Sequence, residues 1–233
     1  FGRAAWQLIE TEVDPYKYQS FSFHAAGVTQ RFTSRLTRRI AAIASEGPVH
    51  GMPPILAFIS TVDATVQAPA VIDSLLGRRA PGGHELVVFD VNRLSVVQPL
   101  LIADPAPLTR RLLAQTRRPF ALTLVTNASA HTLQVMERRS PALGAPTTSR
   151  SLGLAWPRNV FSLSHVALPF PPDDALYGYA APVSDRHVQF GRIEIRGEIG
   201  VLNVPNWMLT RQRSNPFHPY LIERIATFMT GVP

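Results

Sequence analysis

Apolar residues recur along the chain at two different spacings, which predict a succession of helices and strands. Residues 25–45 place Val28, Phe32 and Leu36 at helical spacing between arginines, which predicts an amphipathic helix. Three shorter segments are mainly apolar and are bounded by turn residues, as buried strands are, at residues 55–59, 85–92 and 120–127. Further helices are predicted at residues 69–78, 107–116 and 217–229.

The alternation of helix and strand is typical of an α/β fold. We expect a mostly parallel sheet with helices on both faces, in which residues 55–59 form a central strand because they are apolar on both sides. Pro69 suits the first turn of the next helix, where a missing N–H costs nothing. The polar segment 140–150 is predicted to be a loop, and the proline-rich segment 153–172 to be irregular.

Composition narrows the class of protein. The chain has 233 residues, 45% of them hydrophobic, which is enough for one substantial core or two small ones. No run approaches the roughly 18 apolar residues of a membrane-spanning helix. Cysteine is absent, which excludes disulfides and thiolate metal sites, and no two histidines have the i, i+4 spacing of a helical metal site. We therefore expect neither a metal nor another cofactor, and the compartment stays open.

The formal charge of +7 comes almost entirely from arginine, since Lys17 is the one lysine among 23 basic residues. An acidic partner such as nucleic acid must be considered. The arginines are scattered, however, and most of their pairs close helix-like segments, where cations suit the helix dipole. These pairs are Arg38 and Arg39, Arg78 and Arg79, Arg110 and Arg111, Arg117 and Arg118, and Arg138 and Arg139. We expect no nucleic-acid partner.

One carboxylate stands at the end of a strongly apolar strand. Asp63 follows residues 55–59, and reactive side chains of open α/β sheets gather at the carboxyl ends of strands. His165 follows 102 residues later, in "FSLSHVALPF". Acid before histidine, with the serine earlier still, is the order of catalytic groups along α/β-hydrolase chains.

Other roles are open for these residues. Asp63 could instead cap the helix that follows the strand. Asp90, at the end of the segment 85–92, is a rival acid, although the following "VNR" suggests a structural pair with Arg93. The other histidines lie in loops or on polar faces without a neighbouring acid motif: His24, His50, His84, His131, His187 and His218.

Longer segments resemble the C-terminal half of α/β-hydrolases of the lysophospholipase and serine-aminopeptidase-like branch. "PPILAFISTVDATVQAPAVIDSLL" with "HELVVFDVNR" is similar to the acid-bearing strand, its helix and the final strand, and "VFSLSHVALPFPPDDALYG" to the histidine loop of bacterial members. "DPYKYQSF" and "SNPFHPYLIERI" also match. The resemblance implies a cap or linking helical region at residues 1–50 and core at residues 51–233, with an insertion around residues 94–160.

The resemblance implies a carboxylic ester hydrolase in which Asp63 is the triad acid and His165 the triad base. The family's Gly-x-Ser-x-Gly elbow occurs nowhere in these 233 residues, and the chain begins at Phe1 rather than at methionine. We therefore expect the nucleophilic serine in upstream sequence, in the N-terminal half of the same hydrolase, which would be this chain's partner. The expected substrate is a small ester or a lipid-like molecule, and the fragment alone is expected to be inactive.

A second departure is the long separation between acid and histidine, which family members usually keep short. The alternative function is a non-catalytic binding or assembly module of hydrolase ancestry, because fold does not guarantee function. An aromatic group near the start could line an acyl pocket, although packing is the commoner role of such groups. It comprises Tyr16, Tyr18, Phe21 and Phe23.

Overall fold

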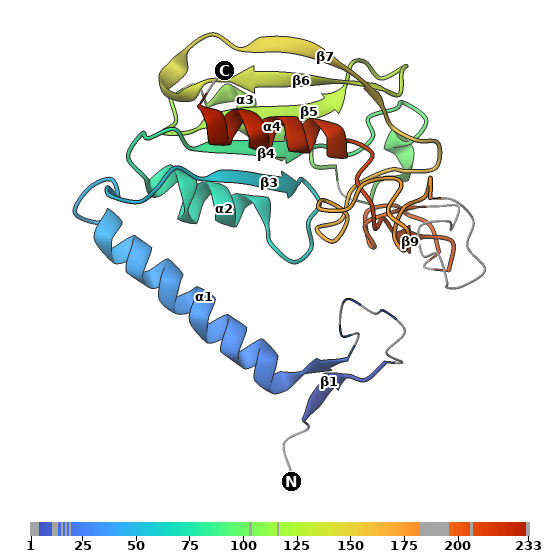
Figure 1. The fold of residues 1–233 in the computed structure, drawn as a ribbon, viewed down its shortest axis with the longest axis horizontal. Helices are drawn as coiled ribbons and strands as arrows, with labels where there is room; N and C mark the ends of the chain where they lie inside the picture. Colours follow the sequence, from blue (N-terminus) through green and yellow to red (C-terminus); the bar gives the residue numbers. More distant parts are fainter. Residues whose placement is uncertain are drawn as a thin grey trace. The chain divides into compact units, whose positions relative to one another are not determined.

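The structure is a computed structural model (Figure 1). It describes residues 5–10, 14, 16, 18, 20–102, 104–115, 117–181, 196–205 and 207–231. The chain divides into two compact units, Phe1–His50 and Gly51–Pro233. His187 lies outside the described residues.

The first unit is a short hairpin followed by one long helix. β1 (Trp6–Leu8) pairs antiparallel with β2 (Phe21–Ser22), and α1 spans Phe23–Ala44. The Ser22 hydroxyl accepts the N–H of Ala25 and so caps α1. The side chains of the aromatic group (Tyr16, Tyr18, Phe21 and Phe23) are 46–90% exposed, so the described residues of this unit do not pack them in a core. The described part of this unit, one helix and two very short strands, provides no second layer that could cover these rings.

The second unit contains a five-stranded sheet, which confirms the α/β class (Figure 1). Its strands follow chain order across the sheet: β3 (Leu56–Ser60), β4 (Glu85–Phe89), β5 (Ala121–Asn127), β6 (Gln134–Ser140) and β7 (Thr148–Ala155). β3, β4 and β5 are parallel, whereas β6 and β7 run antiparallel to their neighbours. The sheet is therefore mixed, and the expectation of a mostly parallel sheet is wrong.

The predicted loop at residues 140–150 is confirmed for residues 141–147, but it connects two strands, β6 and β7, that were not predicted, and residues 148–150 belong to β7. Charged residues interrupt the apolar pattern of both strands. β6 has the sequence "QVMERRS", and its arginine pair lies in a strand and does not close a helix. Glu137 and Arg150 are cross-strand partners, and Arg150 Nε donates to the Glu137 carboxylate at 2.8 Å. A pair of opposite charges across two strands stabilises a sheet but weakens the apolar pattern that predicts it.

β3 lies at an edge of the sheet, not at its centre as predicted. All five residues of β4 are buried, whereas Leu56, Ala57 and Phe58 of β3 are only half-buried. No described strand pairs with the outer edge of β3. Among the described residues, β3 therefore has β4 as a neighbour on one side, and a further strand could pair with its other edge.

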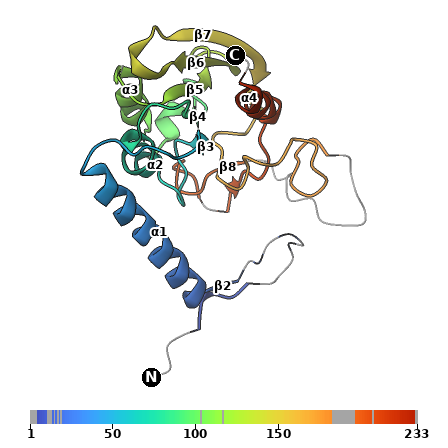
Figure 2. The same ribbon diagram turned by 60° about the vertical axis from the view of Figure 1, so that its left-hand side comes forward.

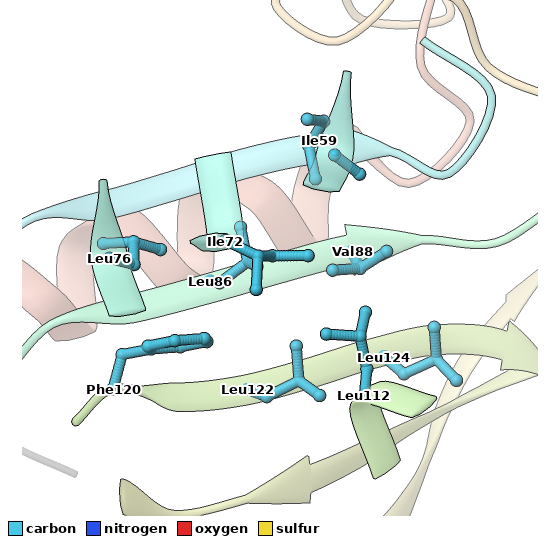
Figure 3. Close-up of a cluster of buried hydrophobic side chains, with 10 residues drawn as sticks. Ile59, Ile72, Leu76, Leu86, Val88, Leu112, Phe120, Leu122 and Leu124 are labelled. Carbon is cyan, nitrogen blue, oxygen red and sulfur yellow. The ribbon is translucent and has the colours of Figure 1, made fainter. Parts of the chain in front are cut away.

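Helices cover both faces of the sheet, as predicted (Figure 2). α2 (Ala68–Ser74), a short 3₁₀ turn (Leu76–Arg78) and α3 (Ala106–Ala114) pack on one face. α4 (His218–Thr230) packs on the other. Alternate side chains of β4 point to opposite faces of the sheet. Leu86 and Val88 belong to the buried cluster shown in Figure 3. Val87 and Phe89 pack with Phe217 in the cluster on the α4 side.

Buried ionic groups fix α4 against the sheet. Arg224 Nη2 lies 2.6 and 2.7 Å from the two carboxylate oxygens of Glu85 on β4. The Tyr220 hydroxyl donates to Glu137 at 2.7 Å, and burial together with that carboxylate raises the pKa of Tyr220 far above its ordinary value. The remaining short elements are β8 (Arg196–Gly197) and β9 (Thr210–Arg211), which pair in parallel beside the candidate site.

Candidate active site

Asp63 lies in the loop that leaves the carboxyl end of β3. Its backbone N–H donates to the carbonyl of Ser60, which turns the chain directly after the strand. Its Oδ1 accepts the N–H groups of Thr65 at 2.7 Å and of Val66 at 2.8 Å. The carboxylate does not cap α2, whose N-cap is Gln67 without a side-chain hydrogen bond. The side chain is only 4% exposed, so the loop holds a fixed and nearly buried carboxylate.

His165 lies in a turn that is anchored on both sides. Ahead of it, the Asn92 N–H at the end of β4 donates to the carbonyl of Phe161 at 2.8 Å. Ser162 Oγ accepts the N–H of Glu198 at 2.8 Å, and Ser164 Oγ donates to the backbone carbonyl of Gln212. These bonds bring the histidine loop to the carboxyl ends of the parallel strands, where Asp63 lies.

The structure brings Asp63 and His165 together, although 102 residues separate them. His165 Nδ1 lies 3.7 Å from Asp63 Oδ1, which is an ion-pair distance and too long for a hydrogen bond. Among the described residues, this buried Nδ1 has no hydrogen-bond partner. An unsatisfied buried nitrogen that faces a carboxylate is costly to keep, and a catalytic role is one explanation for such a group.

The opposite side of the imidazole faces a hydroxyl. His165 Nε2 lies 3.4 Å from Thr65 Oγ1, and the His165 side chain is 30% exposed. The ring is thus flanked by a carboxylate at Nδ1 and by a hydroxyl at Nε2. Sequence reasoning missed Thr65, and its position two residues after Asp63, within a turn closed by the Asp63 carboxylate, is the signal that could have revealed it.

Asp90, the rival acid, has a structural role, and its predicted pairing with Arg93 is confirmed. Arg93 donates from Nε and Nη2 to the two oxygens of Asp90, each at 2.8 Å. Thr126 Oγ1 donates to the same carboxylate at 3.1 Å. Arg93 also donates from Nη1 to Asp104, just ahead of α3. Asp90 is therefore committed to a bridge between strand ends and the start of α3.

The other described histidines form no ion pair with a described carboxylate. His84, the residue before β4, contacts the backbone N–H of Ile55 and the guanidinium of Arg79, and burial and that charge lower its pKa. Within the described part of the chain, His165 is the histidine that pairs with an acid. The described residues hold no cluster of three metal-ligating side chains, and none of their helices is long and apolar enough to cross a membrane.

A pocket of about 430 Å³ opens beside Asp63. Three chain segments line it: residues 61–69 after β3, residues 104–108 at the start of α3, and residues 199–201. The third segment continues from Glu198, whose N–H holds the histidine loop through Ser162. The pocket and His165 are thus connected by a common supporting segment.

Comparisons of the chain with protein-family models, with curated proteins and with solved structures gave no significant match. The α/β-hydrolase resemblance therefore remains a prediction that rests on the sequence segments quoted above.

Proposed function

We propose that residues 51–233 supply the acid and the base of a serine hydrolase that acts on carboxylic esters, with the nucleophile provided by sequence outside this chain. The observation that carries the proposal is the contact between Asp63 and His165. A buried carboxylate after a parallel strand lies 3.7 Å from a ring nitrogen that has no hydrogen-bond partner among the described residues. The acid and the histidine of a catalytic triad must lie this close to each other.

The chemistry follows from what each group can do. A serine hydroxyl is a weak nucleophile at neutral pH, so a base must take its proton as it attacks the ester carbonyl. His165 would accept that proton at Nε2 and return it to the leaving alcohol. Asp63 would keep the neutral ring protonated on Nδ1 and stabilise the imidazolium. The 3.7 Å separation would shorten when substrate binds, because catalytic contacts are often long without it.

The outer edge of β3 offers a place where a strand from a partner segment could pair. The outer edge of β3 has no described strand beside it, and its apolar residues are only half-buried. Unpaired backbone groups on an apolar edge favour the addition of another strand. A strand that pairs in parallel with the outer edge of β3 would place the residue after it at the carboxyl ends of the strands, where Asp63 lies. We propose that the nucleophile reaches His165 in this way.

Substitution of the acid tests the proposal in the protein that carries the nucleophile. Asp63→Asn should lower kcat for a p-nitrophenyl ester by roughly 10⁴, because the amide favours the wrong imidazole tautomer. Asp73→Asn is the control, since Asp73 is about half exposed and pairs with Arg111 at the surface. Equal rates for wild type and Asp63→Asn would remove Asp63 from the mechanism.

A further inference from the structure

The pocket beside Asp63 has the dimensions of a small-molecule site. Its volume of about 430 Å³ lies within the roughly 300–1,000 Å³ that such sites occupy. Its walls are fixed. Arg93 and the Ala106 N–H hold Asp104, and the carbonyl of Val201 accepts the N–H of Ile102 at 2.9 Å. Gly200 has a φ of +80°, a conformation that favours glycine, so the turn at residues 199–201 is locally specified.

The lining is mostly apolar, and its charge has one sign. Val62, Ala68, Leu108 and Val201 contribute apolar surface. Asp63 and Asp104 contribute carboxylates, and none of the described lining residues carries a positive charge. An apolar ligand group would gain by burial here, whereas an anion would meet two like charges.

The charged side chains behind the pocket walls do not change the negative sign of the pocket lining. Arg93 lies behind Asp104 but is shared with Asp90, and Arg110 also acts on Asp104. Although partial burial raises the pKa of Asp104, hydrogen bonds from Arg93 and from a backbone N–H outweigh it and lower that pKa. Asp104 is therefore ionised at neutral pH. Asp63, Asp90 and Asp104 outnumber Arg93 and Arg110. Glu198, beside the wall at residues 199–201, is matched by Arg211 at 3.0 Å, so the region remains negative.

One lining residue, Thr61, carries a polar atom without a hydrogen-bond partner in the described part of the chain. Thr61 Oγ1 is buried and has no hydrogen-bond partner among the described residues. A hydroxyl can both donate and accept, so rotation of the Thr61 side chain toward the pocket would let it bond an uncharged polar atom such as an ester oxygen. Mostly apolar walls with a few polar groups, here Thr61, Gln67 and the two carboxylates, are typical of sites that orient a small ligand.

We infer that this pocket binds the apolar group of an uncharged ester and disfavours the carboxylate that hydrolysis releases. The inference rests on the proposed function. Hydrolysis adds water across the acyl C–O bond and yields an alcohol and a carboxylic acid, which loses its proton to solvent. The acid product therefore differs from the substrate by one negative charge beside Asp63 and Asp104, and this difference promotes its release.

Binding of two matched probes to the full chain tests the inference without turnover. Methyl hexanoate should shift the backbone amide resonances of residues 61–64 and 199–201 in a saturable way. Hexanoate at pH 7 should bind the same residues about tenfold more weakly, since one like charge in a partly desolvated site costs at least about 1.4 kcal/mol. Equal affinity for the two probes, or shifts scattered over other residues, would overturn the inference.

Two pairs of variants complete the test. Ile199→Trp should fill the pocket and abolish the shifts, whereas Ile222→Trp should leave them, since Ile199 is 49% and Ile222 50% exposed and neither supports the core. Asp104→Asn should strengthen hexanoate binding several-fold, and the surface change Asp73→Asn should not. Retained binding in Ile199→Trp would contradict the pocket assignment.

These measurements separate the inference from the proposed function. Amide shifts need neither a serine nor His165, so their absence would overturn the pocket assignment and leave the contact between Asp63 and His165 intact. Conversely, an unaffected kcat in Asp63→Asn would overturn the triad, while ester-selective binding would still show a ligand pocket.

Discussion

Loss of the buried arginine of α4, Arg224, gives the most quantitative prediction from the fold. Arg224 and Glu85 have side chains that are 8% and 5% exposed, and Arg224 Nη2 contacts both carboxylate oxygens. Arg224→Met would leave the Glu85 carboxylate buried with weaker partners. Arg139 Nη2 at 3.5 Å and Thr123 Oγ1 at 3.3 Å would remain.

The magnitude follows from those contacts. Breaking a buried ion pair by removing one partner costs about 3–5 kcal/mol, and the remaining contact with Arg139 favours the lower end. We expect a loss of about 3 kcal/mol in the free energy of unfolding, which corresponds to a fall in Tm of roughly 6–12 °C for a chain of this size. Arg111→Met is the control. Its exposed pair with Asp73 at 3.3 Å should contribute at most about 1 kcal/mol.

Urea unfolding at pH 7, followed by circular dichroism, measures both variants. The double variant Glu85→Gln with Arg224→Met tests the cause, because it removes the stranded charge as well as its partner. It should be more stable than Arg224→Met alone by at least about 1 kcal/mol. A loss below 1 kcal/mol in Arg224→Met, or a double variant less stable than the single one, would refute the reasoning.

Two further predictions concern the polar contacts of the second unit. Burial raises the pKa of Glu137, but hydrogen bonds from Arg150 and Tyr220 outweigh it and hold that pKa below its ordinary value of 4.5. The stabilisation that ionised Glu137 contributes is therefore complete above pH 4.5 and is lost as the pH falls through the folded-state pKa. In urea titrations, the difference in free energy of unfolding between wild type and Glu137→Gln should narrow between pH 5 and pH 3. A constant difference would contradict this. Thr65→Val should change the imidazole ¹⁵N shifts of His165 but alter stability by less than about 0.5 kcal/mol, and Thr65→Ser should preserve the wild-type shifts. Unchanged shifts in Thr65→Val would show that the hydroxyl does not contact the ring.

Periodicity predicted the strands and helices that pack in the usual way. The β4 and β5 segments are mainly apolar because both faces are covered, and α2 begins one residue before the predicted residue 69. β6 and β7 were missed because charged partners such as Glu137 and Arg150 replace the alternating apolar pattern. The edge position of β3 was also missed, since the apolar character of a strand does not show which neighbours are present.

The candidate site was predictable only in part. Asp63 stands out because a carboxylate follows an apolar strand, and His165 because of the order of residues in the segments resembling hydrolases. Their contact depends on loops anchored by Asn92 and Ser162, whose partners lie far away in the sequence. The pocket wall at Asp104 depends in the same way on its bond to Arg93. Such tertiary contacts leave no periodic signal.

Covalent labelling of the natural protein tests the central claim most directly. A fluorophosphonate reacts with activated serines, and mass spectrometry identifies the labelled residue and the segment that carries it. The account predicts a labelled serine within a Gly-x-Ser-x-Gly segment associated with this chain, and loss of labelling in His165→Ala but not in His131→Ala. Absence of any labelled serine, or equal labelling of wild type and His165→Ala, would contradict the claim that Asp63 and His165 serve a nucleophile.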